Sequence, residues 1–178
     1  MAFEPAPFDV VEASRRVWLE RWNDQAASGM AVFTAILRSH QLLSNEIDAV
    51  MRRHDLTFAR YEVLMLLTFT RTGQMPLGKI GQRLQVHPAS VTNVIDRLEV
   101  DGLVRRRAHP TDQRTTLASI TAKGRRVAAA ATEVLNADVF AHVGPPPDQL
   151  VELFDALTDL RRAAGDFDFD AAPAPAAT

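Results

Sequence analysis

The chain has 178 residues, of which 47% are hydrophobic, and its formal net charge is -2 at neutral pH. This length suffices for one sizeable core and is too short for two large independent domains. The chain contains no cysteine, which excludes disulfides, thiolate catalysis, cysteine-ligated zinc and cysteine-based redox sensing.

The N-terminal part of the chain predicts two helices. Residues 1–8 contain two prolines and are expected to be disordered. The apolar spacing predicts an amphipathic helix over residues 9–26, which Ser28 and Gly29 should end, and a long helix over residues 30–54. The sequence shows neither the regions of a signal peptide nor an apolar run long enough to span a membrane, so we expect a cytoplasmic protein.

The middle of the chain predicts a helix-turn-helix. The run FARYEVLMLLTFT predicts a helix over residues 58–70, with Thr57 as its N-cap. A short helix over residues 77–84 and a second over residues 88–101 follow, and Gly102 ends the second. Two short helices joined by a tight link are typical of a helix-turn-helix.

Two short β-compatible runs come next and predict a wing. They are Leu103–Arg107 and Thr115–Ile120, and the segment HPTDQR between them favours a turn through its proline and aspartate. The runs therefore predict a two-stranded antiparallel hairpin. Residues 57–121 together are expected to form a winged helix-turn-helix domain.

The C-terminal part of the chain returns to helical spacing. Thr121 is the expected N-cap of a helix over residues 122–140, and a run of three prolines separates it from a last helix over residues 148–164. Residues 165–178 are rich in Asp, Ala and Pro and are expected to be disordered. The expected fold class is therefore mainly α, with a two-stranded β wing between N- and C-terminal helices.

The net charge conceals an uneven distribution. The segment from Lys79 to Arg126 holds ten Lys and Arg against four Asp and Glu, a charge of +6, and the remainder carries -8. A charged segment alone is often only a solvated surface. It gains meaning here because it coincides with the predicted winged domain, a fold that can present positive charge to a phosphate backbone.

Three linked features resemble the MarR family of bacterial winged-helix regulators. They are the run SVTNVIDRLEVDGLVRRR (Ser90–Arg107), the turn HPTDQR with Asp112 and Arg114, and the run ITAKG (Ile120–Gly124). Their spacing is that of the family's recognition helix, basic strand, wing tip and following helix. The resemblance covers about residues 30–164 and implies a protein that reads duplex DNA.

Four residues near the start of the predicted recognition helix are candidates for DNA contact. Asn93 can bond adenine through two hydrogen bonds, and Thr92 can offer its hydroxyl or place a methyl group against thymine. Ser90 is expected to contact a phosphate or to take part in local capping. His87 is expected either to cap the helix or to contact a phosphate, and a purely structural role remains the alternative for each of the four.

The wing tip supplies two further candidates. The resemblance implies that Arg114 reaches into the minor groove, whose negative potential attracts a flexible cation. Asp112 lies two residues earlier and is expected to orient Arg114. The alternative for this pair is an ordinary surface ion pair.

Three arginines lie on the first wing strand. Side chains alternate along a strand, so Arg105 and Arg107 should share one side while Arg106 takes the other. At least one of the three is expected to contact phosphate. Arg97 on the recognition helix is a further candidate for backbone contact, and it could instead pair with Glu99, Asp101 or Asp112.

The helices outside the winged domain are assigned to dimerisation. Those within residues 9–56 and 122–164 carry apolar stripes that a small winged domain cannot cover. Proteins of the MarR family bury such helices in a two-fold dimer interface, so the resemblance implies a homodimer. The expected DNA partner is a near-palindromic operator with half-sites about one helical turn apart.

The resemblance also implies a repressor that a small molecule releases from DNA. Candidate ligand-lining residues are Trp18, Trp22, Arg38, His40 and Tyr61. The alternative for all five is packing in the core or interface, and Trp22 also invites comparison with a urate-sensing branch that has an extra N-terminal helix. The histidines are scattered along the sequence, so neither a metal nor a cofactor is expected.

The sequence offers no catalytic site. It lacks a glycine-rich phosphate loop, a G-x-S-x-G motif and an H-E-x-x-H motif, and the one tempting acid and base pair, Asp112 and His109, falls on an exposed turn. We therefore expect no enzyme. The remaining alternative is a winged-helix protein-interaction module without DNA readout, which would need neither the +6 segment nor Arg114.

Overall fold

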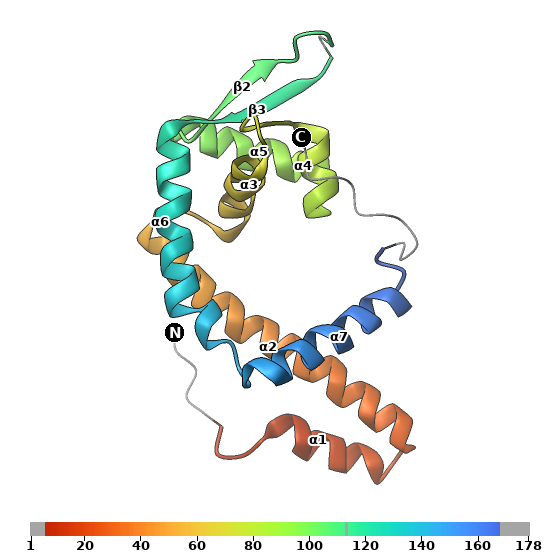
Figure 1. Cartoon of the computed structure of the whole chain (residues 1–178). Helices are drawn as coiled ribbons and strands as arrows, with labels where there is room; N and C mark the ends of the chain where they lie inside the picture. The colour runs from red at the N-terminus through yellow and green to blue at the C-terminus, as the bar shows by residue number, and fades with distance from the viewer. Residues whose placement is uncertain (1–5, 113, 168–178) are drawn as a thin grey trace. The chain divides into compact units, whose positions relative to one another are not determined.

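The computed structural model describes residues 6–112 and 114–167 and divides the chain into two compact units, residues 1–49 and 50–178. Its helices are α1 (Val10–Leu19), α2 (Asp24–Arg53), α3 (Phe58–Phe69), α4 (Leu77–Leu84), α5 (Pro88–Val100), α6 (Ala122–Asp138), the short 3-10 helix η1 (Phe140–His142) and α7 (Pro147–Ala163) (Figure 1). Its strands are β1 (Gln74–Pro76), β2 (Val104–Ala108) and β3 (Thr116–Ile120). The expected mainly α fold with a helix-turn-helix and a β wing is confirmed. The predicted disorder of residues 1–5 and 168–178 falls outside the described residues.

The first unit holds α1 and most of α2, and the helix break predicted there was wrong. We expected it at Ser28 and Gly29, whereas the chain leaves helical geometry earlier, over residues 20–23. The Asn23 side chain accepts a hydrogen bond from the backbone N–H of Ala26 at 2.9 Å, which starts α2. Such a cap offsets the roughly 1 kcal/mol that a glycine costs inside a helix, so Ser28 and Gly29 stay helical.

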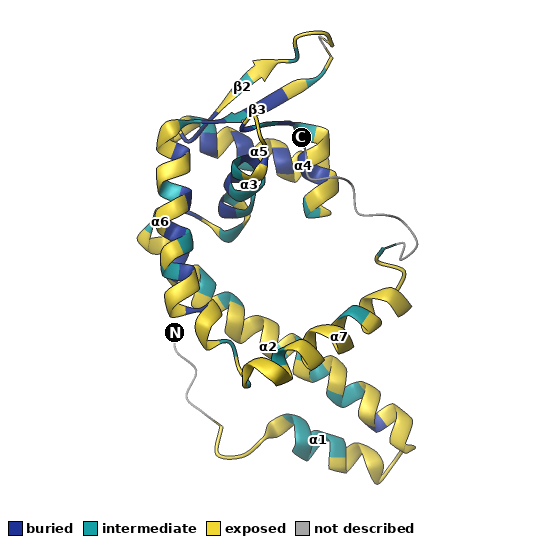
Figure 2. Cartoon of the chain, viewed as in Figure 1, coloured by how far each residue is buried: buried dark blue, intermediate teal, exposed yellow. Residues whose placement is uncertain are grey.

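The core of the second unit lies where α3, α4, α5 and the sheet meet, which is where dark blue residues gather in Figure 2. α3 contributes Leu64 and Leu67, α5 contributes Ile95 and Leu98, and all four are fully buried. Burial of one such side chain contributes roughly 1.5–3 kcal/mol. These contacts therefore hold α5 firmly against α3 and β2.

The wing belongs to a three-stranded antiparallel sheet with the strand order β1-β3-β2. β2 and β3 form the predicted hairpin, in which Val104 lies opposite Ile120. The third strand, β1, was not predicted, because three residues that include a proline give too weak a local signal. Gln74 pairs with Ser119 only because the fold brings the loop after α3 beside β3.

The base of the wing is joined to α6 by a threonine and a glycine. Thr121, the predicted N-cap, accepts a hydrogen bond from the backbone N–H of Gly124 at 3.0 Å and donates one to the carbonyl oxygen of Gly102 at 2.8 Å. A Cβ on Gly124 would collide with the carbonyl oxygen of Leu103 and would press on the Ile120 side chain. Only a glycine fits where α6 meets the wing.

Replacing Gly124 should therefore destabilise the second unit. We expect Gly124→Ala to lower the free energy of unfolding by about 1–3 kcal/mol, the usual cost of overpacking. Gly78→Ala on α4 is the matched control, because a Cβ there meets nothing within 4 Å. Its stability should stay unchanged or rise slightly, since alanine favours a helix. Urea and thermal unfolding measure both variants, and equal stabilities would contradict the close contact.

Candidate nucleic-acid interface

The turn between α4 and α5 determines how α5 is presented. Gln85 adopts a left-handed conformation with φ 53° and ends α4. Pro88 opens α5, and the His87 side chain accepts a hydrogen bond from the backbone N–H of Ala89 at 3.2 Å. Of the two roles predicted for His87, the structure thus shows capping of α5.

α5 buries one face and exposes the opposite one. Its buried side chains are Val91, Ile95 and Leu98. The predicted DNA contacts on α5, all of them exposed, are Ser90, Thr92, Asn93 and Arg97. The Thr92 hydroxyl donates a hydrogen bond to the carbonyl oxygen of Pro88 at 3.2 Å, which leaves its methyl group as the freer surface for contact.

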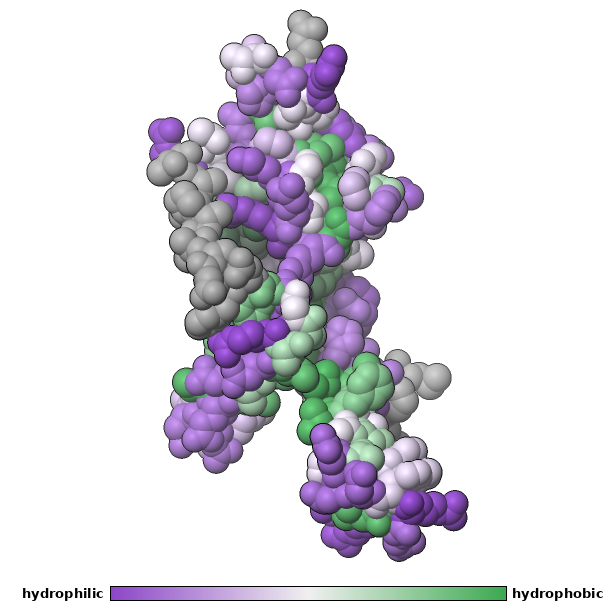
Figure 3. All heavy atoms as spheres, turned by 90° about the vertical axis from the view of Figure 1, so that its right-hand side faces the viewer, coloured by the Kyte–Doolittle hydropathy of each residue, from purple (hydrophilic) through white to green (hydrophobic). Residues whose placement is uncertain are grey.

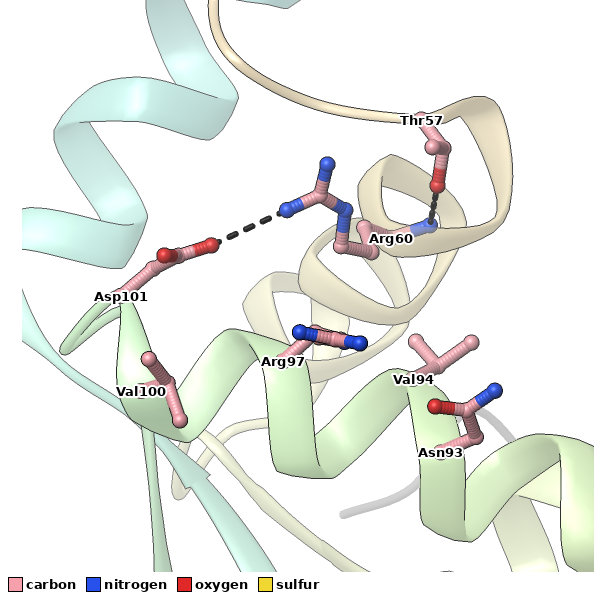
Figure 4. Close-up of a pocket in the computed structure, with 7 residues that line it drawn as sticks. All are labelled: Thr57, Arg60, Asn93, Val94, Arg97, Val100 and Asp101. Carbon is pink, nitrogen blue, oxygen red and sulfur yellow. Dashed lines mark hydrogen bonds and ion pairs between the residues drawn. The ribbon is translucent and has the colours of Figure 1, made fainter.

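An open cavity of about 490 Å³ lies between α3 and the outer side of α5 (Figure 4). The residues that line it are Thr57, Arg60, Asn93, Val94, Arg97, Val100 and Asp101. Arg60 pairs with Asp101 at 3.0 Å across the end of this cavity, and its side chain is only 20% exposed. Sequence reasoning missed Arg60, because nothing local marks a residue whose partner lies 41 positions away.

The ion pairs considered for Arg97 are not found among the described residues. Asp101 is held by Arg60, and Glu99 is held by Arg106 at 2.7 Å. Asp112 binds groups of the wing turn instead. Arg97 is therefore an exposed cation on the outer side of α5.

The three wing arginines separate as the strand alternation predicted. Arg105 and Arg107 are exposed, whereas Arg106 is half-buried. Arg106 faces α5 and pairs with both Asp96 and Glu99. Of the three candidates for phosphate contact, the middle one thus already pairs with acids of α5.

The wing tip is organised by Asp112. Its carboxylate accepts hydrogen bonds from the backbone N–H of Arg114 at 3.0 Å and from the Thr115 hydroxyl at 2.6 Å. The Thr115 hydroxyl, followed by the Arg114 N–H, lowers the pKa of Asp112 below its usual value. Asp112 therefore fixes the backbone that carries Arg114, and no ion pair among the described residues joins it to the guanidinium that it is expected to orient.

Four of the five ligand candidates lie in the first unit. The rings of Trp18 and Trp22 contact each other with centroids 4.4 Å apart, and both are exposed. Arg38 donates a hydrogen bond to Gln41 at 3.1 Å and lines an open cavity of about 560 Å³ together with Phe8, Asp9 and neighbouring residues. His40 is exposed and lies 3.5 Å from the Ser44 hydroxyl.

Tyr61, the fifth ligand candidate, lies in the second unit. It is buried, and its hydroxyl is 2.9 Å from the Thr132 hydroxyl. It lines a mostly apolar, open cavity of about 350 Å³ that also contains Met65 and Glu62. Burial raises the pKa of the Glu62 carboxyl above its usual value. Arg38 and Tyr61 thus each line a cavity within their own unit.

The described residues contain neither a membrane-spanning helix nor a metal-binding cluster. Within residues 6–112 and 114–167, no helix is both long and apolar enough to cross a membrane. In the same part of the chain, no group of three or more His, Cys, Asp and Glu residues is placed to hold a metal ion. In the wing turn, Asp112 is exposed and His109 is half-buried, and neither lines the cavities beside α3, α4 and α5.

The comparisons with known proteins match the helix-turn-helix and the wing. The MarR family model matches residues 56–116. The HTH-type transcriptional regulator MhqR of Bacillus subtilis is 34% identical over 95 residues, which is 53% of this chain and 64% of MhqR. The chain thus spans less than two thirds of the first curated relatives that it matches.

Two solved structures from Streptomyces coelicolor are similar over most of their length. The MarR family transcriptional regulator Sco5413 is 50% identical, with a TM-score of 0.71, and the match covers 79% of this chain and 98% of that one. Sco3205, a MarR family transcriptional regulator solved in complex with DNA, is 20% identical, with a TM-score of 0.69 and coverage of 82% and 91%. At that lower identity, Sco3205 shows a shared fold alone.

Removing the Asp112 carboxylate should loosen the wing tip. We expect Asp112→Ala to raise the amide hydrogen-exchange rate of Arg114 at least several-fold, because that N–H loses its charged acceptor. Thr111→Val is the control, since the Thr111 hydroxyl contacts only His109 in the described structure. The pKa of Asp112 is lowered in the folded state, so the protection should persist above its ordinary pKa and disappear as the pH falls through the lowered value. Exchange measured by NMR that is equal in both variants would contradict this role.

Proposed function

Because the chain belongs to the MarR family of transcriptional regulators, we propose that it is a homodimer that reads double-stranded DNA with α5 and the wing. One observation carries the proposal. Every acid in the +6 segment has a partner inside the fold, namely Asp96, Glu99, Asp101 and Asp112. The exposed arginines around them, Arg97, Arg105, Arg107 and Arg114, have no ion-pair partner among the described residues. A surface of this kind presents net positive charge to a phosphate backbone.

The outer face of α5 supplies the proposed sequence readout. Asn93 is exposed, so its amide is free to bond the N6 and N7 edge of adenine in the major groove. The Thr92 methyl group suits contact with a thymine methyl. Arg97, one helical turn after Asn93, is placed to reach a phosphate or a guanine at the edge of the groove.

The wing supplies the proposed contacts outside the major groove. Arg105 and Arg107 share the exposed side of β2 and suit phosphate contact. Arg114 lies at the tip on a backbone that Asp112 fixes, which suits insertion into the minor groove. Ser90 and His87, both exposed at the start of α5, suit contact with a flanking phosphate.

The proposed dimer rests on uncovered apolar surface. α1 and α7 contain no buried residue, and most of their large apolar side chains are exposed. On α7 these are Val151, Leu153, Phe154, Leu157 and Leu160. Figure 3 shows such apolar patches in green beside the purple charged residues of the surface. Several large apolar side chains exposed on one helix, as on α7, support an interface with a partner.

The remaining parts of the proposal follow from the DNA partner and from the family. A duplex DNA partner supports a cytoplasmic location, and we propose that the residues of this surface bind DNA and catalyse no reaction. We propose repression, with release by a small molecule, as the mode of regulation. The cavities at Arg38 and at Tyr61 support a ligand-binding role for those two residues.

Selection of binding sites from a random duplex pool tests the proposed function. We expect enrichment of a near-palindrome with half-sites about one helical turn apart. Binding to the enriched duplex should weaken steeply with salt, with a slope of about -0.9 per phosphate contact. Weak binding without enrichment or salt dependence would reject DNA readout and would favour a winged-helix module that binds protein.

Removal of the wing-tip cation should weaken binding to that enriched duplex. We expect Arg114→Ala to reduce affinity tenfold or more without changing the oligomeric state, because the minor-groove cation is lost. Arg52→Ala, which removes an exposed arginine from α2, is the control and should bind normally. Fluorescence anisotropy measures both, and equal affinities would remove the wing tip from the mechanism.

A charge on the apolar face of α7 should dissociate the dimer. Phe154 is 65% exposed, and Phe154→Glu would place a carboxylate in the proposed interface, where its desolvation is costly. We expect a shift from dimer to monomer in sedimentation or light scattering. Val100→Glu on α5, where Val100 is 83% exposed, is the control and should remain dimeric. A Phe154→Glu variant that stays dimeric would remove α7 from the interface.

A further inference from the structure

Arg106 joins the wing to one side of α5. Its backbone N–H and its guanidinium donate hydrogen bonds to the two carboxylate oxygens of Glu99, at 2.9 Å and 2.7 Å. The same guanidinium pairs with Asp96 at 2.5 Å and donates to the carbonyl oxygen of Thr92 at 3.4 Å. Thr92, Asp96 and Glu99 follow one another at helical spacing, so one side chain of β2 holds two turns of α5.

The burial of this cluster is uneven. The Arg106 side chain is 28% exposed, whereas those of Asp96 and Glu99 are 54% and 39% exposed. The backbone N–H of Arg106, followed by its guanidinium, lowers the pKa of Glu99 below its usual value. Glu99 is therefore ionised at neutral pH, and one guanidinium faces two acids.

The two acids create an electrostatic problem for a helix that enters DNA. Duplex DNA carries about one negative charge per 1.7 Å of its axis, so carboxylates that face the groove are repelled. Asp96 and Glu99 lie on the side of α5 that faces β2, while Asn93 and Arg97 line the cavity on its other side. The position of the acids relative to the DNA thus depends on the strand that holds them.

We propose that Arg106 is a positioning residue, which locks the rotation and depth of α5 against the wing and withdraws Asp96 and Glu99 from the DNA. This inference rests on the proposed DNA-binding function. Arg106 itself makes no phosphate contact. Arg105 and Arg107, exposed on the opposite side of β2, carry the phosphate contacts of this strand.

Positioning and phosphate contact have different consequences for binding. Loss of a phosphate contact weakens binding to all sequences about equally and reduces the salt slope by about one. Loss of a positioning residue misplaces Asn93 against the base edges, so it lowers the preference for the operator over other sequences. The ratio of the two affinities therefore separates the roles.

The first experiment compares three variants of the full chain, Arg105→Gln, Arg106→Gln and Arg107→Gln. Each is titrated with the selected operator and with a scrambled duplex over a range of salt concentrations. We expect Arg106→Gln to lower the ratio of operator to scrambled affinity by about tenfold or more, as for loss of charged hydrogen bonds. Arg105→Gln and Arg107→Gln should preserve the ratio and flatten the salt dependence. An unchanged ratio in Arg106→Gln would overturn the proposal.

A double-mutant cycle then asks whether Arg106 acts through the acids. Arg106→Gln is repeated in the background Asp96→Asn with Glu99→Gln, where nothing remains to be withdrawn from DNA. We expect the loss of operator affinity to be at least threefold smaller in that background than in the wild-type chain. An equal loss in both backgrounds would overturn the proposal and make Arg106 a direct phosphate contact.

Arg106→Lys tests whether the forked guanidinium is needed to hold Asp96 and Glu99 together. Lysine keeps the charge and lacks the forked donors that reach two carboxylates at once, so operator preference should stay low. If lysine restored the full preference for the operator, a positive charge alone would suffice, and the proposed role of the guanidinium would be overturned. If Arg106→Gln fails to fold, Arg106→Lys, which keeps the charge and the backbone bond to Glu99, carries the same test of operator preference. A wild-type chain without any duplex preference would instead refute the proposed function, and this inference with it.

Discussion

Burial of one face of α5 is the constraint on which the candidate interface depends. Val91, Ile95 and Leu98 are at most 3% exposed, so α5 cannot turn about its own axis without bringing apolar surface into water. This packing limits the rotation of α5: it turns Asn93 outward and sets the acids of α5 beside β2, where Arg106 holds them. The helix-turn-helix therefore exposes its polar face by burying its apolar one.

The charge of the winged domain follows from the same packing. A positive surface forms within a chain of net charge -2 because the acids of this region are paired with arginines and turn amides of the same domain. Arg60 and Arg106 both form ion pairs within the domain. They therefore affect the charge of the surface only by neutralising the acids that they bind. Exposed ion pairs contribute little stability on their own. The main effect of these ion pairs is thus to neutralise the acids, so that the unpaired arginines determine the charge of the surface.

Local signals in the sequence predicted the fold well, whereas long-range contacts were not visible in it. Thr57 and Thr121 cap their helices as expected, because a cap depends only on the next three residues. Apart from the break between α1 and α2, the helices lie within about two residues of their expected bounds, since apolar periodicity is also local. β1 and the partner of Arg60 were missed, because each depends on a segment more than 40 residues away.

Long-range contacts also explain why the roles of the candidate site residues were only partly predictable from the sequence. The sequence predicted the alternation of Arg105, Arg106 and Arg107, but alternation says only that one of them differs from the other two. Which side faces α5 depends on the register of β2 against β3 and on the approach of Glu99, and neither is a local property. A row of identical basic residues thus contains two kinds of charge, one that acts within the protein and one available to its partner. Composition cannot separate the two kinds, whereas burial and ion pairing do.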